Sequence, residues 1–154
     1  YLYNTADNHK KIGEALQNMW QTELGVTVNL NNQDWNVFLQ NRKDGNFQIA
    51  RNGWIADYND PCSFLDMWYT DGGNNDAQYS NPDYDKLYEE LKGEMDPEKR
   101  KDLIFQMQQI LVDDAAVLID GYYNSSMIYS KKVGSAHIHT ADYYWLSTEI
   151  TPAE

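Results

Sequence analysis

The chain has 154 residues, a length typical of one globular domain. Its 24 acidic residues against 12 basic ones give a formal net charge of −12, which would repel nucleic acid and anionic membrane surfaces at long range. The hydrophobic fraction of 42% excludes an intrinsically disordered chain, and the longest apolar run, Ala115–Ile119, is far shorter than the about 20 residues of a membrane span.

Apolar periodicity predicts that strands and helices alternate in the first third of the chain. The predicted elements are a strand at Tyr1–Asn4, a helix from Asp7 or Asn8 to about Leu24, a strand at Val26–Leu30, a helix from Asp34 to near Gly45, and a strand at Phe47–Arg51. Capping residues set the helix starts, and glycines set the ends. This order predicts a βαβαβ unit and therefore a largely parallel sheet.

Residues 52–81 form a long segment that is rich in Gly, Pro, Asn and Asp but keeps many large apolar side chains. These side chains are Trp54, Tyr58, Phe64, Leu65, Met67, Trp68 and Tyr69. A connection of this length is uncommon as a mere linker, and long loops often carry function. We expect this loop to pack on another part of the molecule.

Two helices and two strands are predicted in the rest of the chain. One helix spans Pro82 to about Lys92, the next follows the start signal Asp96-Pro97 and ends near Asp113, and strands follow at Val117–Tyr123 and Met127–Tyr129. The pattern weakens from Lys131 onward. Because a mature protein seldom opens inside a core strand, we also expect the chain to be a piece of a longer protein.

Arg51, Trp54 and Asp57 are spaced three residues apart directly after the third predicted strand. Ligands of parallel α/β sheets bind where strands end and loops begin. A cation for a carboxylate, an anion for an ammonium group and a flat apolar wall between them suit a zwitterionic ligand. The sequence contains no nucleophile elbow, no phosphate-binding glycine loop and no zinc-protease helix, so we expect no enzyme activity.

The string Gly53-Trp54-x-Ala56-Asp57-Tyr58-x-Asp60-Pro61 resembles the signature in the carboxy-terminal lobe of oligopeptide-binding proteins. These belong to family 5 of the extracellular solute-binding proteins, the substrate-binding components of ABC importers. Further matches in order and spacing are Tyr3-Asn4-Thr5 with His9-Lys10-Lys11, Leu24-Gly25-Val26-x-Val28, Gln33-Asp34-Trp35 with Phe38-Leu39, and Tyr84-Asp85-Lys86-Leu87. The resemblance runs from Tyr1 to about Leu146, and several separated matches are far more specific than one short motif.

The resemblance implies an α/β fold, one lobe of a type II periplasmic-binding-protein clamshell with a largely parallel mixed sheet flanked by helices. Residues 1–130 would form the carboxy-terminal ligand-binding lobe, and residues 131–154 a C-terminal segment that packs on the first lobe in the intact protein. The implied function is capture of short oligopeptides for uptake, with the membrane permease subunits of an ABC importer as partners and no cofactor. The implied location is extracytoplasmic, in the periplasm or at the cell surface through a lipid anchor.

Within the motif, the resemblance assigns ligand-binding roles to two residues. Asp57 corresponds to the carboxylate that holds the α-ammonium group of the peptide, and Trp54 to a wall of the binding cleft. On the residues alone, such an Asp is more often an ordinary loop carboxylate, and a buried Trp is usually a core residue.

Outside this motif, four more positions correspond to ligand contacts. Arg51 and His9 match residues that meet the C-terminal carboxylate of the peptide at certain ligand lengths, and Arg42 and Trp35 match positions that line side-chain pockets. Each position also has a structural alternative. The alternatives are an exposed strand end for Arg51, a surface residue at a helix start for His9, a solvated helix end for Arg42 and a core position for Trp35.

Other ligands and other function classes stay open from the sequence. Within the family the ligand could be a dipeptide, a nickel complex or haem, although a nickel complex would not need an amine-binding Asp57. Outside the family, the chain could be a protein-interaction module whose aromatic loop docks a partner, or a hydrolase that uses Asp57 and Asp60. His137 and His139 could share one face of a strand, but two ligands do not make a zinc site. Cys62 is the one cysteine, so it cannot form a disulfide within the chain.

Overall fold

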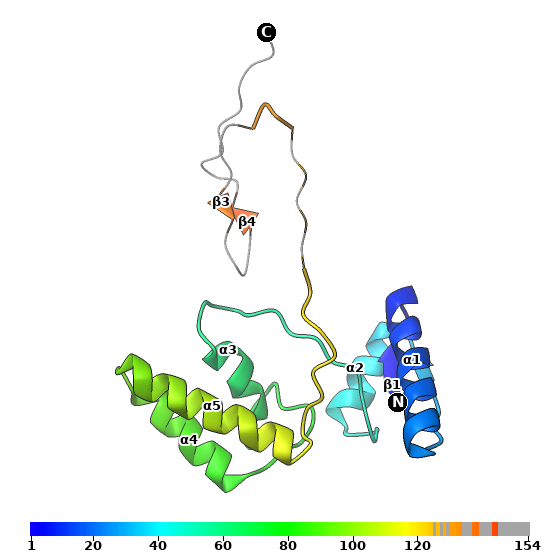
Figure 1. Cartoon of the computed structure of the whole chain (residues 1–154), viewed down its shortest axis with the longest axis horizontal. Coiled ribbons are helices and arrows are strands. Elements are labelled where there is room, and N and C mark those ends of the chain that lie inside the picture. The colour runs from blue at the N-terminus through cyan, green and yellow to red at the C-terminus, as the bar shows by residue number, and fades with distance from the viewer. Residues whose placement is uncertain (125, 127, 129, 134–136, 139–142, 145–154) are drawn as a thin grey trace.

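The computed structural model describes residues 1–124, 126, 128, 130–133, 137–138 and 143–144 (Figure 1). The helices are α1 (Asp7–Leu24), α2 (Trp35–Lys43), α3 (Cys62–Leu65), the 3₁₀ helix η1 (Asp66–Trp68), α4 (Pro82–Gly93) and α5 (Pro97–Asp113). The strands are β1 (Leu2–Asn4), β2 (Asn31–Gln33), β3 (His137–Ile138) and β4 (Tyr143–Tyr144). Figure 1 shows α1, α2 and β1 grouped together, and α3, α4 and α5 in a second group.

Strand β1 is the centre of a small parallel sheet. It pairs in parallel with β2, and on its other side Leu2 forms an isolated parallel bridge with Ala50. Leu2 and Tyr3 are both buried, so β1 is covered on both faces, as strands of parallel sheets are. The predicted βαβαβ unit is therefore confirmed, with its third strand reduced to the bridge at Ala50.

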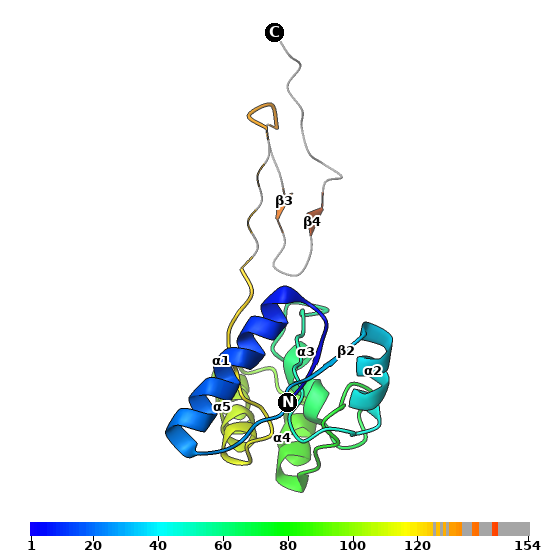
Figure 2. The ribbon, with the colours of Figure 1, turned by 90° about the vertical axis from the view of Figure 1, so that its right-hand side faces the viewer.

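Helices α1 and α2 cover opposite faces of this sheet (Figure 2). The chain crosses from β1 to β2 through α1 and returns past β1 to Ala50 through α2. Two right-handed crossovers in opposite directions leave their helices on opposite faces. Helix α1 comes close through Gly13, where a Cβ atom would lie 3.3 Å from the Tyr1 ring. Helix α2 contributes Phe38, which is fully buried.

The second strand lies later in the chain than predicted. The prediction of Val26–Leu30 is wrong, because β2 spans Asn31–Gln33. The register of the pairing gives the reason. The amino group of Tyr1 donates to the carbonyl oxygen of Asn29 at 2.8 Å, so the residues before Asn29 have no β1 backbone beside them.

The start of α1 also differs from the prediction, whereas its end does not. The N-cap is Ala6 rather than Asp7 or Asn8, and Asp7 lies in the first helical turn, where a negative charge is favourable. Gly25 ends the helix with a left-handed φ of 66°, and its N–H donates to the carbonyl oxygen of Gln21.

A second hydrophobic core lies where α3 meets the hairpin of α4 and α5. Its buried members are Leu65, Tyr84, Leu91, Leu103, Met107 and Leu111. The hydroxyl of Tyr84 donates to the carbonyl oxygen of Leu65 at 2.6 Å, so the polar end of this buried ring has a partner. Both helices of the hairpin begin as predicted, because the side chains of Asn81 and Asp96 accept backbone N–H groups at their first turns.

The loop 52–81 packs against this hairpin, which confirms the prediction that it packs on another part of the molecule. It carries α3 and η1, and Leu65 belongs to the hairpin core. Three of its side chains are buried, Ser63, Leu65 and Met67. The loop is therefore a folded part of the structure and not a linker.

One asparagine holds the two ends of a bend within this loop. The side-chain amide of Asn75 donates to the carbonyl oxygens of Tyr69 at 3.0 Å and Tyr79 at 2.7 Å. Its own side-chain oxygen accepts the N–H of Tyr79 at 3.0 Å. A single side chain therefore joins the two ends of the bend.

The two strands predicted after α5 have different outcomes. The strand predicted at Val117–Tyr123 is wrong, because none of the described strands pairs with this segment and Tyr122 is largely exposed. The strand predicted at Met127–Tyr129 rests on residues outside the described part, and so does His139. Most of 131–154 lies there too.

Across the described part of the chain, no helix combines the length and the hydropathy that crossing a bilayer requires.

Candidate functional site

Three parallel segments end at the same edge of the sheet, and a predicted ligand residue follows each of them. His9 in the first turn of α1 follows β1, Trp35 at the first position of α2 follows β2, and Arg51 follows the bridge residue Ala50. The connections after β1 and β2 leave toward opposite faces. In open parallel sheets, ligands bind in the crevice at such a point.

Asn4 brings two of these residues together at the end of β1. The Nδ1 atom of His9 lies 3.1 Å from the carbonyl oxygen of Asn4, which accepts only, so this nitrogen carries the proton. The guanidinium of Arg51 donates to Oδ1 of Asn4 at 3.4 Å and to the hydroxyl of Tyr123 at 2.9 Å. Asn4 thus contacts both the imidazole of His9 and the guanidinium of Arg51.

Trp35 presents an accessible aromatic face beside this edge. Its side chain is half exposed, and its ring stacks on that of Phe38 with 5.9 Å between the centroids and 29° between the planes. Since Phe38 is fully buried, it fixes the indole from below. Trp35 can therefore serve as part of a wall while it also packs on the core.

Arg42 is held in a network of its own. It lies in the last turn of α2, but its side chain is only 14% exposed and is not solvated. Its Nε donates to the carboxylate of Asp76 at 2.7 Å, and its Nη1 donates to Oδ1 of Asn52 at 2.7 Å. The guanidinium carbon also lies 5.3 Å from the centroid of the Phe38 ring. These contacts join α2 to both ends of the loop 52–81.

The motif residues Trp54 and Asp57 lie on the loop that follows the sheet. Asp57 is exposed, and its backbone N–H donates at 2.8 Å to the hydroxyl of Ser63, which is fully buried. Trp54 is half buried, and its Nε1 is buried without a hydrogen-bond partner among the described residues. Buried polar atoms normally have partners, so this unpaired N–H is an exception among the described residues.

Within the described part of the chain, no hydrogen bond or ion pair joins Trp54 or Asp57 to His9, Arg51 or Trp35. The candidate site therefore consists of the carboxyl edge of the sheet and of the motif loop.

Sequence reasoning missed an ion pair that supports the motif loop. Asp60 accepts from Nη2 of Arg100 at 2.6 Å and from the N–H of Cys62 at 2.9 Å. Partial burial alone would raise the pKa of Asp60, but the bonds from Cys62 and Arg100 outweigh it and lower that pKa below its ordinary value. The available signal was a cation in the first turn of α5, where the helix dipole disfavours it unless a specific partner is present.

Asp66 is a second carboxylate that the sequence did not single out. Its Oδ1 is buried without a hydrogen-bond partner among the described residues. Burial first, and the charge of Asp57 second, raise the pKa of Asp66. Ionisation of Asp66 is therefore disfavoured in the folded protein.

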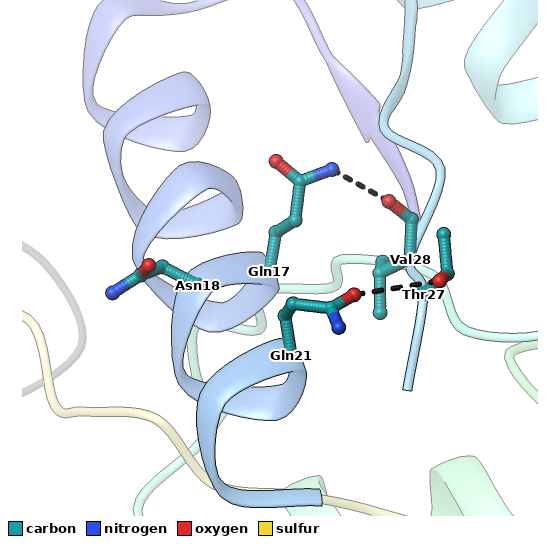
Figure 3. Close-up of a pocket in the computed structure, with 5 residues that line it drawn as sticks. All are labelled: Gln17, Asn18, Gln21, Thr27 and Val28. Carbon is teal, nitrogen blue, oxygen red and sulfur yellow. Dashed lines mark hydrogen bonds between the residues drawn. The ribbon is translucent and has the colours of Figure 1, made fainter. Parts of the chain in front are cut away.

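A hollow of about 250 Å³ lies elsewhere, between α1 and the segment that precedes β2 (Figure 3). In Figure 3 the side-chain amide of Gln17 points to the carbonyl oxygen of Val28, and the hydroxyl of Thr27 bonds to the oxygen of Gln21. These bonds attach α1 to the chain before β2. The hollow therefore lies at the opposite end of the strands from the candidate site.

The parallel sheet between α1 and α2 defines an α/β domain. Residues 1–76 match the family model described as "Bacterial extracellular solute-binding proteins, family 5 Middle". The chain is 42% identical over 133 residues to the periplasmic oligopeptide-binding protein OppA of Salmonella typhimurium, covering 86% of this chain and 24% of that protein. It is 39% identical over 127 residues to the oligopeptide-binding protein OppA of Bacillus subtilis, covering 82% of this chain and 23% of that protein.

A solved structure agrees with these sequence matches. The Haemophilus influenzae OppA complex with the peptide RPPGFSPFR superposes with a TM-score of 0.72 at 37% identity, over 75% of this chain and 23% of that one. The chain therefore belongs to family 5 of the bacterial extracellular solute-binding proteins. It spans about a quarter of the length of the curated relatives it matches.

Proposed function

We propose that the protein is the substrate-binding component of an ABC importer and captures short oligopeptides for uptake. The observation that carries this proposal is the match to family 5 together with the candidate ligand residues at the carboxyl edge of the sheet and on the motif loop. The chain supplies the carboxy-terminal lobe of a type II clamshell, residues 1–130. Residues 131–154 pack on the first lobe of the intact protein.

Asp57 anchors the α-ammonium group of the peptide. Its exposure supports this role, because an incoming cation can reach it without displacing a neighbour. A charge-assisted hydrogen bond of this kind contributes about 1.5–3 kcal/mol net. The half-buried ring of Trp54 supplies a wall beside the anchor.

The edge of the sheet receives the rest of the peptide. Arg51 and His9, both in contact with Asn4, meet the C-terminal carboxylate at certain ligand lengths. Trp35 and Arg42 line side-chain pockets. Main-chain hydrogen bonds to an extended peptide do not depend on its sequence, which permits many ligands.

Hinge closure over the ligand, and no catalytic step, is the mechanism. A hydrolase reading would need Asp60 as a reacting carboxylate, but Asp60 is engaged by Arg100. The protein acts outside the cytoplasm, in the periplasm or lipid-anchored at the cell surface, and delivers peptides to membrane permease subunits. Nucleic acid is not a partner, given the net charge of −12.

Calorimetric titration of the full-length protein tests this function. The ligands are peptides of roughly two to six residues, in free and N-acetylated form, and the protein is compared with its Asp57→Ala variant. Free peptides should bind, and both acetylation and loss of Asp57 should weaken binding roughly 10- to 100-fold.

The variant Asp102→Ala is the matched control, because it removes the same charge from an exposed position on α5. It should bind like the wild type. Equal binding of acetylated and free peptides would show that Asp57 is not the anchor. If no peptide binds, the protein's ligand belongs to another chemical class.

A further inference from the structure

The anchor Asp57 lies on a loop that is held by side chains from other elements. Its backbone N–H bonds to the buried hydroxyl of Ser63 in α3, at 2.8 Å. The N–H of Cys62, the residue before Ser63, bonds to Oδ1 of Asp60 at 2.9 Å. The path from Asp60 to the anchor is therefore a short series of hydrogen bonds around the first turn of α3.

Arg100 fixes the beginning of that path to the α4–α5 hairpin. Its Nη2 donates to Oδ2 of Asp60 at 2.6 Å, and its Nη1 donates to the carbonyl oxygens of Leu91 at 3.0 Å and Glu94 at 3.3 Å. The planar guanidinium thus binds the carboxylate with one nitrogen and the end of α4 with the other. Its position is set by backbone atoms and not by a second flexible side chain.

We propose that Arg100 and Asp60 are positioning residues for the ligand anchor Asp57. This inference rests on the proposed function. It means that Arg100, which lies on α5 and is 43 positions from Asp57, controls how strongly the protein prefers peptides with a free amino group. The ion pair orders the loop before the ligand arrives, so that the carboxylate of Asp57 does not have to be ordered by binding itself.

The neighbours of Arg100 on α5 show that this pairing is specific. Lys99 and Lys101 pair with Glu94 and Glu98 at 3.9 Å, and both lysine side chains are more than two-thirds exposed. The side chain of Arg100 is 24% exposed and reaches its partner at 2.6 Å. A cation in the first turn opposes the helix dipole, and this contact offsets that cost.

The experiment compares Asp60→Asn, Arg100→Met and Arg100→Lys in the full-length protein, with Lys101→Met as the matched control. Asp60→Asn keeps the shape of the side chain and an acceptor for the Cys62 N–H but loses the ion pair. Two quantities are measured. One is hydrogen exchange of the amides of residues 55–63, and the other is the ratio of affinities for free and N-acetylated peptides.

Exchange of the Asp57 and Cys62 amides should accelerate in Asp60→Asn and Arg100→Met, while the amides of α4 and α5 stay protected. The preference for the free amino group should fall about threefold to tenfold, a part of the loss that follows removal of the anchor itself. Arg100→Lys keeps the charge but not the fork, so it should restore part of both quantities. Lys101→Met should leave both unchanged.

A merely structural role predicts a different result. Thermal stability would fall in Arg100→Met while the ratio of free to acetylated affinity stayed at its wild-type value, which would overturn the positioning role. Unchanged exchange at residues 55–63 would overturn it as well, whether or not any peptide binds. Failure of the wild-type protein to bind peptides would instead refute the proposed function, and the exchange data would then decide alone whether the ion pair orders the loop.

Discussion

The ion pair between Arg42 and Asp76 offers a direct measure of how far a predicted ligand residue also holds the fold together. Arg42→Met keeps the apolar stem against the ring of Phe38 and removes the guanidinium, and Asp76→Asn keeps the shape and removes the charge. In each variant, the remaining charged side chain of the pair has lost its oppositely charged partner. Both single variants should therefore lower the free energy of unfolding.

The magnitude follows from the exposure of the two side chains. Each is 14% exposed, and the two atoms lie 2.7 Å apart, so the interaction is a charge-assisted hydrogen bond that water screens weakly. Such a bond contributes about 1.5–3 kcal/mol, and the double-mutant cycle should give a coupling energy of about 1–2 kcal/mol.

The exposed pair of Lys101 and Glu98 is the control. These side chains are 78% and 85% exposed at a separation of 3.9 Å, and the coupling energy should be about 0–0.5 kcal/mol. The assay is urea unfolding followed by tryptophan fluorescence, repeated at about 0.5 M salt. Salt should abolish the small coupling of the exposed pair and leave most of the coupling between Arg42 and Asp76.

Equal coupling energies for the two pairs, or a coupling between Arg42 and Asp76 that vanishes in salt, would refute this reasoning. The two residues would then be joined only loosely, and Arg42 would be free to turn toward a ligand. A large, salt-resistant coupling would mean that any ligand reaches Arg42 in a position already fixed by the fold.

Three further substitutions test other parts of the structure. Tyr84→Phe should cost about 1–3 kcal/mol in urea unfolding, because the buried carbonyl of Leu65 loses its donor. The pKa of Asp66 is raised above 3.8 by burial and by Asp57, so its ionisation costs stability above that pH; Asp66→Asn should raise the melting temperature near neutral pH and not at about pH 3. Gly25→Ala should cost about 1–2 kcal/mol in urea unfolding from left-handed strain alone, because no atom lies within 4 Å of the added Cβ.

Local signals in the sequence were sufficient for the four longer helices, apart from the start of α1, but not for the short α3 and η1. The starts of α4 and α5 follow from Asn81-Pro82 and Asp96-Pro97, where a capping side chain and a proline agree, and the end of α1 follows from Gly25. The apolar residues of α1 are only partly covered, since Met19 is half exposed and Gly13 makes the close contact with the sheet. Periodicity identifies a helix more reliably than it identifies which of its faces is covered.

Strand positions depended on pairing that no local pattern contains. Val26–Leu30 alternates as a strand should, yet the ladder begins at Asn31 because β1 sets the register. Val117–Tyr123 also has the composition of a strand but has no paired partner among the described strands. A strand is a property of two segments, so a reading of one segment at a time places it poorly.

The candidate site was predictable where residues directly follow strands. Arg51 could be placed at the end of a strand from the pattern itself, whereas His9 and Trp35 came from the family resemblance, and the structure places all three at one edge. The support from Arg100 to Asp60 joins residues 40 apart in sequence and depends on how the hairpin packs, which no spacing rule expresses. Candidate ligand residues close to strand ends could therefore be predicted from the sequence, but the tertiary contacts that hold them in place could not.

Asn75 has a consequence for how this loop can change in evolution or engineering. Its side chain ties Tyr69 to Tyr79, and the backbone bonds from Gly72 to Tyr69 and from Asn75 to Gly72 hold the stretch between them. Within it, a side chain at Gly72 would collide with the Tyr69 carbonyl at 2.9 Å, whereas Gly73 has open space around it. A side chain or a label at position 73 therefore meets no neighbouring atom, whereas residues inserted after Gly73 would separate the Asn75 N–H from the Gly72 carbonyl oxygen that it bonds at 3.0 Å.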